Sequence, residues 1–148
     1  RRRSVRVSKV DGSRIFRWPV RVYYEDTDAG GVVFYANYLK FMERARTEWL
    51  RNLGFEQDAL RGREGVLFAV RRAALDYLRP ALFNDLLTVT VDVTQFGGAS
   101  LDFVQEVRRD ADDVLCCRGV VKVACINERT MRPQRLPETL LAEITNVL

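Results

Sequence analysis

The feature that most constrains the fold is one long amphipathic segment, Asn37–Leu53. Its apolar residues recur at spacings of three and four, which aligns them in one stripe along a helix. These residues are Tyr38, Phe41, Met42, Ala45, Trp49 and Leu53. Burying Phe41, Trp49 and Leu53 would contribute about 1.5–3 kcal/mol each, so the helix is predicted to be a core element. With Val33–Tyr35 included, we expect it to run about 30 Å. Gly54 followed by Phe55 is typical of a left-handed C-cap.

Strand patterns lie on both sides of this helix. Before it, Val20, Val22 and Tyr24 alternate with polar or exposed positions, which predicts a strand over residues 20–25. After it, strand-like patterns cover residues 66–78, 87–94, 99–108 and 114–126. The last of these is apolar on both faces around Arg118 and Lys122, which favours a central position in the sheet.

Turn signals separate these strands. Gly97–Gly98 predicts a tight two-residue hairpin, and Asp110–Asp113 marks another turn. Pro137 is placed for the first turn of a short terminal helix that carries Leu140, Leu141 and Ile144. The order is a strand, the long helix and four more strands. It predicts an α+β fold in which a five-stranded antiparallel sheet packs on one central helix.

Composition adds limits on domain count and partners. The chain has 148 residues and a net charge of +4, but residues 1–17 alone carry seven basic side chains and one acid. We therefore expect a flexible basic tail over residues 1–16 and a single domain over 17–148, whose charge is slightly negative. Such a tail could contact nucleic acid or anionic lipid, or be a solvated leader; we expect no nucleic-acid partner.

The apolar runs and the cysteines of the sequence indicate where the protein is located and in which redox state its thiols are. No apolar run approaches the roughly 18 residues of a membrane span, and the basic N-terminus lacks the apolar segment of a signal peptide. Cys116, Cys117 and Cys125 lie in one apolar, strand-like segment without metal-type spacing. We interpret them as reduced core thiols of a cytoplasmic protein.

The stretch Tyr23–Tyr35 joins the first strand to the helix and holds Glu25, Asp26 and Asp28 next to Gly30–Gly31. Three interpretations are open. Asp26 or Asp28 could cap the helix while the glycines supply the turn. The D-x-D-x-x-G pattern could begin a calcium loop, but position twelve is Asn37 where such loops have Glu, so we expect no metal. Third, a carboxylate could do chemistry beside helix N-terminal amides that stabilise an oxyanion.

The chain contains no histidine, which excludes the usual Ser-His and Cys-His machinery. A carboxylate is then the strongest candidate for a nucleophile or a general base. The residues leave open which carboxylate that would be.

A wider pattern carries a family resemblance. Tyr24-Glu-Asp-Thr-Asp28, Gly31-Val-Val33, Asn37-Tyr38 and the Glu43–Glu48 helix resemble the hot-dog-fold acyl-CoA thioesterases of the 4-hydroxybenzoyl-CoA thioesterase-like group. The likeness is greatest to the branch associated with the bacterial Tol-Pal system, and extends from about Phe16 to Leu140.

The resemblance implies roles for individual residues. It places the catalytic carboxylate on Asp28 and the substrate-polarising amide at Tyr35, with Gly31 allowing close approach of the acyl group and Val33 in the substrate site. Many members of the Tol-Pal branch have His where this chain has Tyr35, so an imidazole role is absent. The proposed contribution of that residue is a backbone N–H, which the substitution preserves.

The resemblance also implies acyl-CoA as substrate, no cofactor apart from the CoA within it, and a homo-oligomer, either a dimer or a tetramer. Arg129, Arg132 and Arg135 form a basic cluster suited to CoA phosphates, or else an ordinary solvated loop. The alternative function is a weakly catalytic or non-catalytic module that binds acyl carrier protein or phospholipid-synthesis enzymes at the membrane surface. A hot-dog dehydratase fits less well, because those enzymes generally use histidine.

Overall fold

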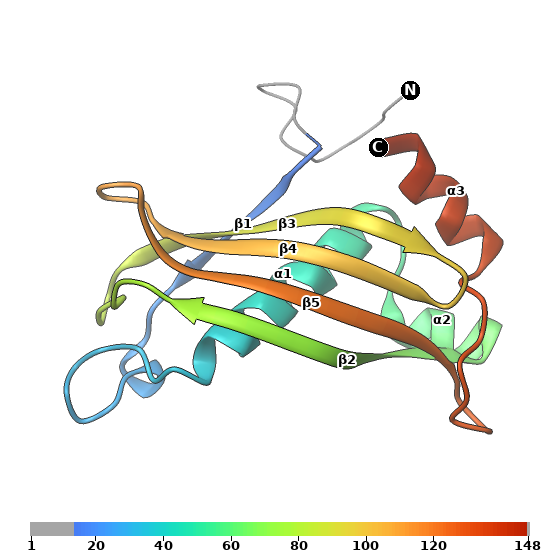
Figure 1. The fold of residues 1–148 in the computed structure, drawn as a ribbon, viewed down its shortest axis with the longest axis horizontal. Coiled ribbons are helices and arrows are strands. Elements are labelled where there is room, and N and C mark those ends of the chain that lie inside the picture. Colours follow the sequence, from blue (N-terminus) through green and yellow to red (C-terminus); the bar gives the residue numbers. More distant parts are fainter. Residues whose placement is uncertain (1–13, 148) are drawn as a thin grey trace.

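The computed structural model describes residues 14–147, which form a five-stranded antiparallel sheet and three α-helices (Figure 1). The strands are β1 (Phe16–Arg21), β2 (Val66–Tyr77), β3 (Leu86–Gly97), β4 (Ser100–Arg109) and β5 (Val114–Asn127). The helices are α1 (Asn37–Asn52), α2 (Gln57–Glu64) and α3 (Glu138–Val147), with a 3₁₀ turn, η2, at Tyr24–Asp26. The sheet order is β1-β3-β4-β5-β2, and α1 crosses one face of it.

The predicted α+β architecture is confirmed, and the packing follows the predicted pattern. In β3 the alternating residues Leu87, Val89 and Val91 are all buried against α1. On the helix side, Phe41, Met42 and Ala45 are fully buried. β5 pairs with β4 on one side and β2 on the other, which is the central position that its two apolar faces indicated.

The first strand is displaced from its predicted place. β1 covers Phe16–Arg21, and residues 24–26 form η2 where the alternation over 20–25 predicted strand. The strand ends because the Tyr23 N–H donates to Asp26 Oδ2 at 2.8 Å, so it is not free to continue a ladder. Phe16, which the sequence assigned to the tail, is buried in β1. Residues 1–13 of the predicted tail lie outside the described residues.

The central helix is shorter than expected, because Val33–Tyr35 are not part of it. Val33 bridges to Thr27, and its N–H donates to the Ala81 carbonyl at 2.8 Å. The 16 residues of α1 therefore span about 24 Å. Its predicted end is confirmed: Gly54 has φ +98°, and the Phe55 N–H donates to the Leu50 carbonyl at 3.1 Å.

Two further details differ from the sequence prediction. α2 was not predicted, because only Leu60 among its eight residues is buried and the segment shows no apolar stripe. The β3–β4 hairpin has Gly98–Ala99 as its loop, one residue later than Gly97–Gly98, since Gly97 still pairs with Ser100. The terminal helix begins at Glu138, and the Pro137 carbonyl accepts the Leu141 N–H at 3.0 Å.

The three cysteines are free and buried, as expected for core thiols. Burial raises the pKa of Cys117 to about 12 and that of Cys125 to about 11, which keeps both protonated at neutral pH. Among the helices within residues 14–147, none combines the length and the apolar character that a membrane crossing needs.

Candidate active site at the Asp28 turn

The segment between η2 and α1 is a compact turn held by its own backbone. The Asp28 N–H donates to the Val32 carbonyl at 2.9 Å, and the Gly31 N–H donates to the Asp28 carbonyl at 3.0 Å. A bridge between Thr27 and Val33 closes the turn at its base. Gly31 has φ +82°, a conformation that favours glycine. There is space for a side chain at position 31, because no atom lies within 4 Å of the position that a Cβ would take. The glycine is therefore explained by the backbone conformation.

Asp26 and Asp28 occupy different environments. Asp26 is buried, its Oδ2 accepts the Tyr23 N–H, and its carbonyl accepts the Phe34 N–H at 2.9 Å and the Asn37 side chain at 2.8 Å. Asp28 is exposed, and Gly30 donates its N–H to Asp28 Oδ1 at 2.8 Å. Asp26 is therefore engaged in holding the turn, while Asp28 Oδ2 accepts no hydrogen bond within the described residues.

The N-terminus of α1 lies directly after this turn. The N-cap is Ala36, which has no side-chain cap, so neither aspartate caps the helix as the structural interpretation suggested. Within residues 14–147, the N–H groups of Tyr35 and Ala36 donate to no acceptor. The positive end of the helix macrodipole lies at this position, so two free donors lie in a region that favours negative charge.

An aromatic cluster surrounds Tyr35. The Tyr35 and Tyr77 rings meet edge to face at 5.9 Å, and the Tyr38 ring lies 5.7 Å from that of Tyr77. These three tyrosines, with Val33, line a hollow of about 250 Å³ that extends to Pro80. The sequence patterns did not identify Tyr77 as a site residue, because Tyr77 is far from Tyr35 along the chain and the two rings meet only in the folded structure.

Tyr38 links the helix to the wall of this hollow. Its hydroxyl accepts the Ala81 N–H at 3.1 Å in a buried position. Burial raises the pKa of Tyr38 to about 12, so the side chain is a neutral phenol under physiological conditions. Tyr38 is therefore a structural support for this region.

The basic cluster predicted for CoA is not close to Asp28 within one chain. Arg129, Arg132 and Arg135 lie in the segment after β5. That segment begins beside Val66, which pairs with Asn127, whereas Tyr35 contacts Tyr77 at the other end of β2. The length of β2 separates the two positions, a distance of about 35 Å.

The layout of these elements defines the class of protein. One long helix crosses an antiparallel sheet of order β1-β3-β4-β5-β2, with an acidic turn leading into the helix: this is the hot-dog fold predicted from the sequence. Residues 22–144 match the thioesterase-like superfamily. The chain belongs to that family.

The individual proteins to which the chain is similar are consistent with this family. The chain is 46% identical over 129 residues to an acyl-CoA thioester hydrolase, YbgC, of Escherichia coli O6:H1, a match that covers 87% of this chain and 95% of the relative. It is 45% identical over 127 residues to the acyl-CoA thioesterase YbgC of Haemophilus influenzae, covering 86% and 92% of the two chains. A probable thioesterase from Bartonella henselae has a solved structure with a TM-score of 0.78 and 36% identity, covering 83% and 99%.

Proposed function

We propose that this protein hydrolyses acyl-CoA thioesters to a carboxylic acid and CoA. The observation that carries the proposal is the exposed carboxylate of Asp28, fixed on a turn that leads into the free N–H groups of Tyr35 and Ala36. A carboxylate and a pair of preorganised amide donors are the two components that acyl transfer requires in the absence of histidine. The names of the YbgC relatives support the choice of acyl-CoA as the substrate.

In this mechanism the thioester carbonyl oxygen accepts a hydrogen bond from the Tyr35 N–H. Asp28 then attacks the acyl carbon, or removes a proton from a water that attacks it. A C–O bond forms, the C–S bond breaks, and the CoA thiolate takes up a proton. In the first route, water hydrolyses the resulting anhydride in a second step; both routes use the same residues. Gly31 keeps the turn free of a side chain at the acyl group, and Val33 forms part of its wall.

We further propose that the working form is a homo-oligomer in which β2 pairs with β2 of a second copy. β2 is an edge strand, and its residues from Arg71 to Ala74 are exposed. A long exposed edge is a template for pairing with another chain. Two-fold antiparallel pairing would bring the Tyr77 end of one copy beside the Val66 end of the other. Arg129, Arg132 and Arg135 of one copy would then approach the Asp28 turn of its partner, where they can contact CoA phosphates.

The test is a thiol-release assay of the full chain with short, long and aromatic acyl-CoAs, alongside Asp28→Asn. The wild type should release CoA, and the variant should lose about 10²–10⁴-fold in turnover. Because Asn can still accept the Gly30 N–H, its melting temperature should stay at the wild-type value. Full turnover by a folded Asp28→Asn protein would refute the assignment of Asp28, and failure to hydrolyse any acyl-CoA would refute the function.

The predicted cytoplasmic location, the Tol-Pal association and the acyl carrier protein partner stay predictions. So does the alternative of a membrane-surface binding module, because its main support is the basic tail. Deleting residues 1–13 separates the two functions: a thioesterase keeps its hydrolysis, whereas a tail-dependent module loses its partner or membrane association.

A further inference from the structure

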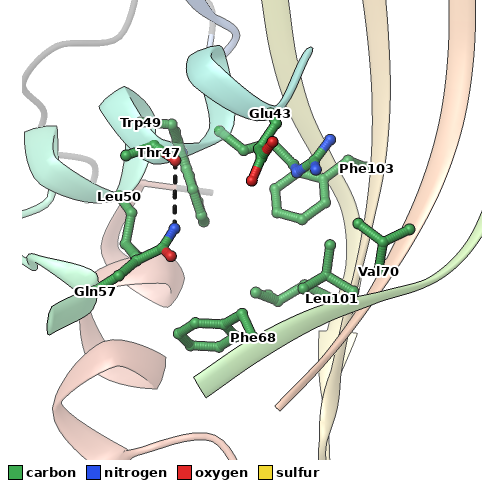
Figure 2. A pocket seen from close by; sticks show the side chains of 11 residues that line it. Glu43, Thr47, Trp49, Leu50, Gln57, Phe68, Val70, Leu101 and Phe103 are labelled. Atoms are coloured by element: carbon green, nitrogen blue, oxygen red, sulfur yellow. Dashed lines mark hydrogen bonds between the residues drawn. The ribbon is translucent and has the colours of Figure 1, made fainter. Parts of the chain in front are cut away.

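A second cavity lies under the C-terminal half of α1, away from the Asp28 turn. It has a volume of about 130 Å³ and lies between α1 and α2 on one side and the sheet on the other (Figure 2). Its walls are mostly aromatic and aliphatic: Trp49, Leu50, Phe68, Val70, Leu101, Phe103 and Val123. A cavity of about 150 Å³ holds one benzene ring. This cavity is therefore sized for about six heavy atoms.

One cation is built into this apolar wall. Arg46 lines the cavity, and its guanidinium lies 5.9 Å from the centre of the Phe103 ring. Its Nη1 donates to Gln105 Oε1 at 2.9 Å. Gln105 is fully buried, and its amide nitrogen donates to the Met42 and Thr90 carbonyls at 3.1 Å each. Those two backbone contacts fix the orientation of Gln105, which in turn fixes Arg46.

Arg46 forms no ion pair with a carboxylate within residues 14–147, although the charge of Glu43 acts on it. Its Nη1 is bonded to Gln105, and its Nε and Nη2 donate to no acceptor there. Glu43, one turn earlier, also lines the cavity, but the residue is exposed, so water screens its charge. Desolvation lowers the pKa of Arg46, an effect that Glu43 only partly opposes. A half-buried guanidinium with free donors is a site for a carboxylate.

We propose that this cavity receives the far end of the substrate's acyl group, and that Arg46 selects compact acyl groups ending in a carboxylate. This inference rests on the proposed thioesterase function and names the substrate class for it. The apolar walls bury the methylenes, the volume limits the chain to about six heavy atoms beyond the thioester carbon, and Arg46 pairs with the terminal anion. Gln105 is the positioning residue for Arg46.

The acyl group reaches the cavity from the Asp28 turn of a second copy. Phe68 and Val70 of the cavity lie in the first half of β2, whereas Tyr35 touches Tyr77 at its end. Antiparallel β2–β2 pairing about a two-fold axis places the end of one strand beside the first half of the other. A thioester held at one copy's Asp28 turn thus extends its acyl group toward the partner's Arg46.

The test compares two acyl-CoAs of equal size. Glutaryl-CoA and 5-methylhexanoyl-CoA both carry about six heavy atoms beyond the thioester carbon, but the first ends in a carboxylate and the second in an isopropyl group. The wild type should prefer glutaryl-CoA in kcat/KM by about 10- to 100-fold, the effect expected of charge-assisted hydrogen bonds. Equal values, or a preference for the isopropyl group, would overturn the inference and leave the thioesterase function standing. No hydrolysis of any acyl-CoA would overturn both.

Arg46→Met isolates the guanidinium, with Arg44→Met as the matched control, since Arg44 is exposed on the same helix. Arg46→Met should abolish the preference by lowering kcat/KM for glutaryl-CoA alone, and Arg44→Met should retain it. An equal loss on both substrates in a folded Arg46→Met protein would mean that Arg46 has only a structural role.

Mixed oligomers test whether the acyl group extends from the Asp28 turn of one copy to Arg46 of the other. Asp28→Asn and Arg46→Met chains are given different tags, co-expressed and purified through both tags. A mixed dimer then holds one site with both Asp28 and Arg46 intact, so its glutaryl-CoA activity should reach about half that of the wild type. Activity no higher than that of the Arg46→Met parent would overturn the two-copy arrangement.

Discussion

At the N-terminal end of α1 the chain is fixed mainly by backbone hydrogen bonds, whereas its C-terminal half is fixed by packed side chains. The Asp28 turn is closed by N–H groups donating to carbonyls, and its Asp28 and Tyr35 side chains are exposed. In the C-terminal half, Trp49 meets the Phe103 ring edge to face at 5.4 Å, and Arg46 is held by buried Gln105.

The difference separates two tasks within one helix. A turn held by its own backbone can present a carboxylate and free amides to a substrate without burying them. A packed cavity can distinguish substrates by size and charge, because each wall residue is fixed by its neighbours. We therefore expect substitutions at the turn to affect turnover most, and substitutions near the cavity to affect stability and selectivity.

The largest stability effect is expected for Gln105→Leu. The substitution removes the buried amide that donates to the Met42 and Thr90 carbonyls, and it leaves the half-buried Arg46 guanidinium without its acceptor. We expect a loss of about 3 kcal/mol, the upper part of the range for unsatisfied buried groups. Denaturant unfolding measures it. A loss below about 0.5 kcal/mol would show that the Gln105 network does not hold the cavity.

Tyr38→Phe removes the acceptor of the buried Ala81 N–H and should cost about 2 kcal/mol near neutral pH. The difference in unfolding free energy between the wild type and the variant should shrink as the pH rises from 10 to 12, because folding raises the pKa of Tyr38. The folded pKa is about 12 and the usual value is 10.0, so the folded state binds more protons in that window and loses stability as pH rises through it. Unfolding free energies of both proteins from about pH 9 to about pH 12 measure the difference; a difference that stayed constant would contradict this account.

Gly31→Ala places a side chain at φ +82°, which we expect to cost about 1–2 kcal/mol. Because the strain falls on the turn itself, turnover of the folded fraction should fall as well. Gly62→Ala is the matched control, since Gly62 lies inside α2, where an added Cβ would meet no atom within 4 Å and φ is not positive. Equal stability changes in the two variants would argue against a strained turn.

Asp26→Ala should destabilise the protein less than the three preceding substitutions, by about 1 kcal/mol, as for a lost capping interaction. The Tyr23 N–H loses its acceptor, but it is only partly buried, so water can replace the carboxylate. Thermal unfolding of the variant checks this value. A much larger loss would mean that the buried Asp26 carboxylate holds more of the turn than its one hydrogen bond accounts for.

Much of the fold was predictable because its residues obey simple periods. The stripe of α1 and the alternation in β3 each depend on local spacing, and both are confirmed. The errors occur where a tertiary or side-chain contact overrides the pattern. Residues 20–25 alternate like a strand, yet Asp26 takes the Tyr23 N–H and turns the chain. Val33 was expected in the helix, yet its N–H is bound by the Ala81 carbonyl.

The candidate site could be predicted from the sequence only where its parts are close along the chain. Glu25, Asp26, Asp28, Gly31 and Tyr35 lie on one continuous stretch, so their proximity needed no fold. Arg46, by contrast, lies outside the apolar stripe of the helix, and only the neighbouring strand reveals its partner Gln105. Tyr77 contacts Tyr35 from a distant part of the chain, a contact that no local pattern encodes.

Comparing the two aspartates of the turn tests whether Asp28 is the catalytic carboxylate. Asp28→Asn and Asp26→Ala are assayed for thiol release from acyl-CoA, and their unfolding free energies are measured in parallel. Asp28→Asn should lose about 10²–10⁴-fold in turnover at wild-type stability, whereas Asp26→Ala should lose stability but keep far more turnover per folded molecule. The reverse pattern, with Asp28→Asn fully active and Asp26→Ala inactive while folded, would contradict the assignment of Asp28.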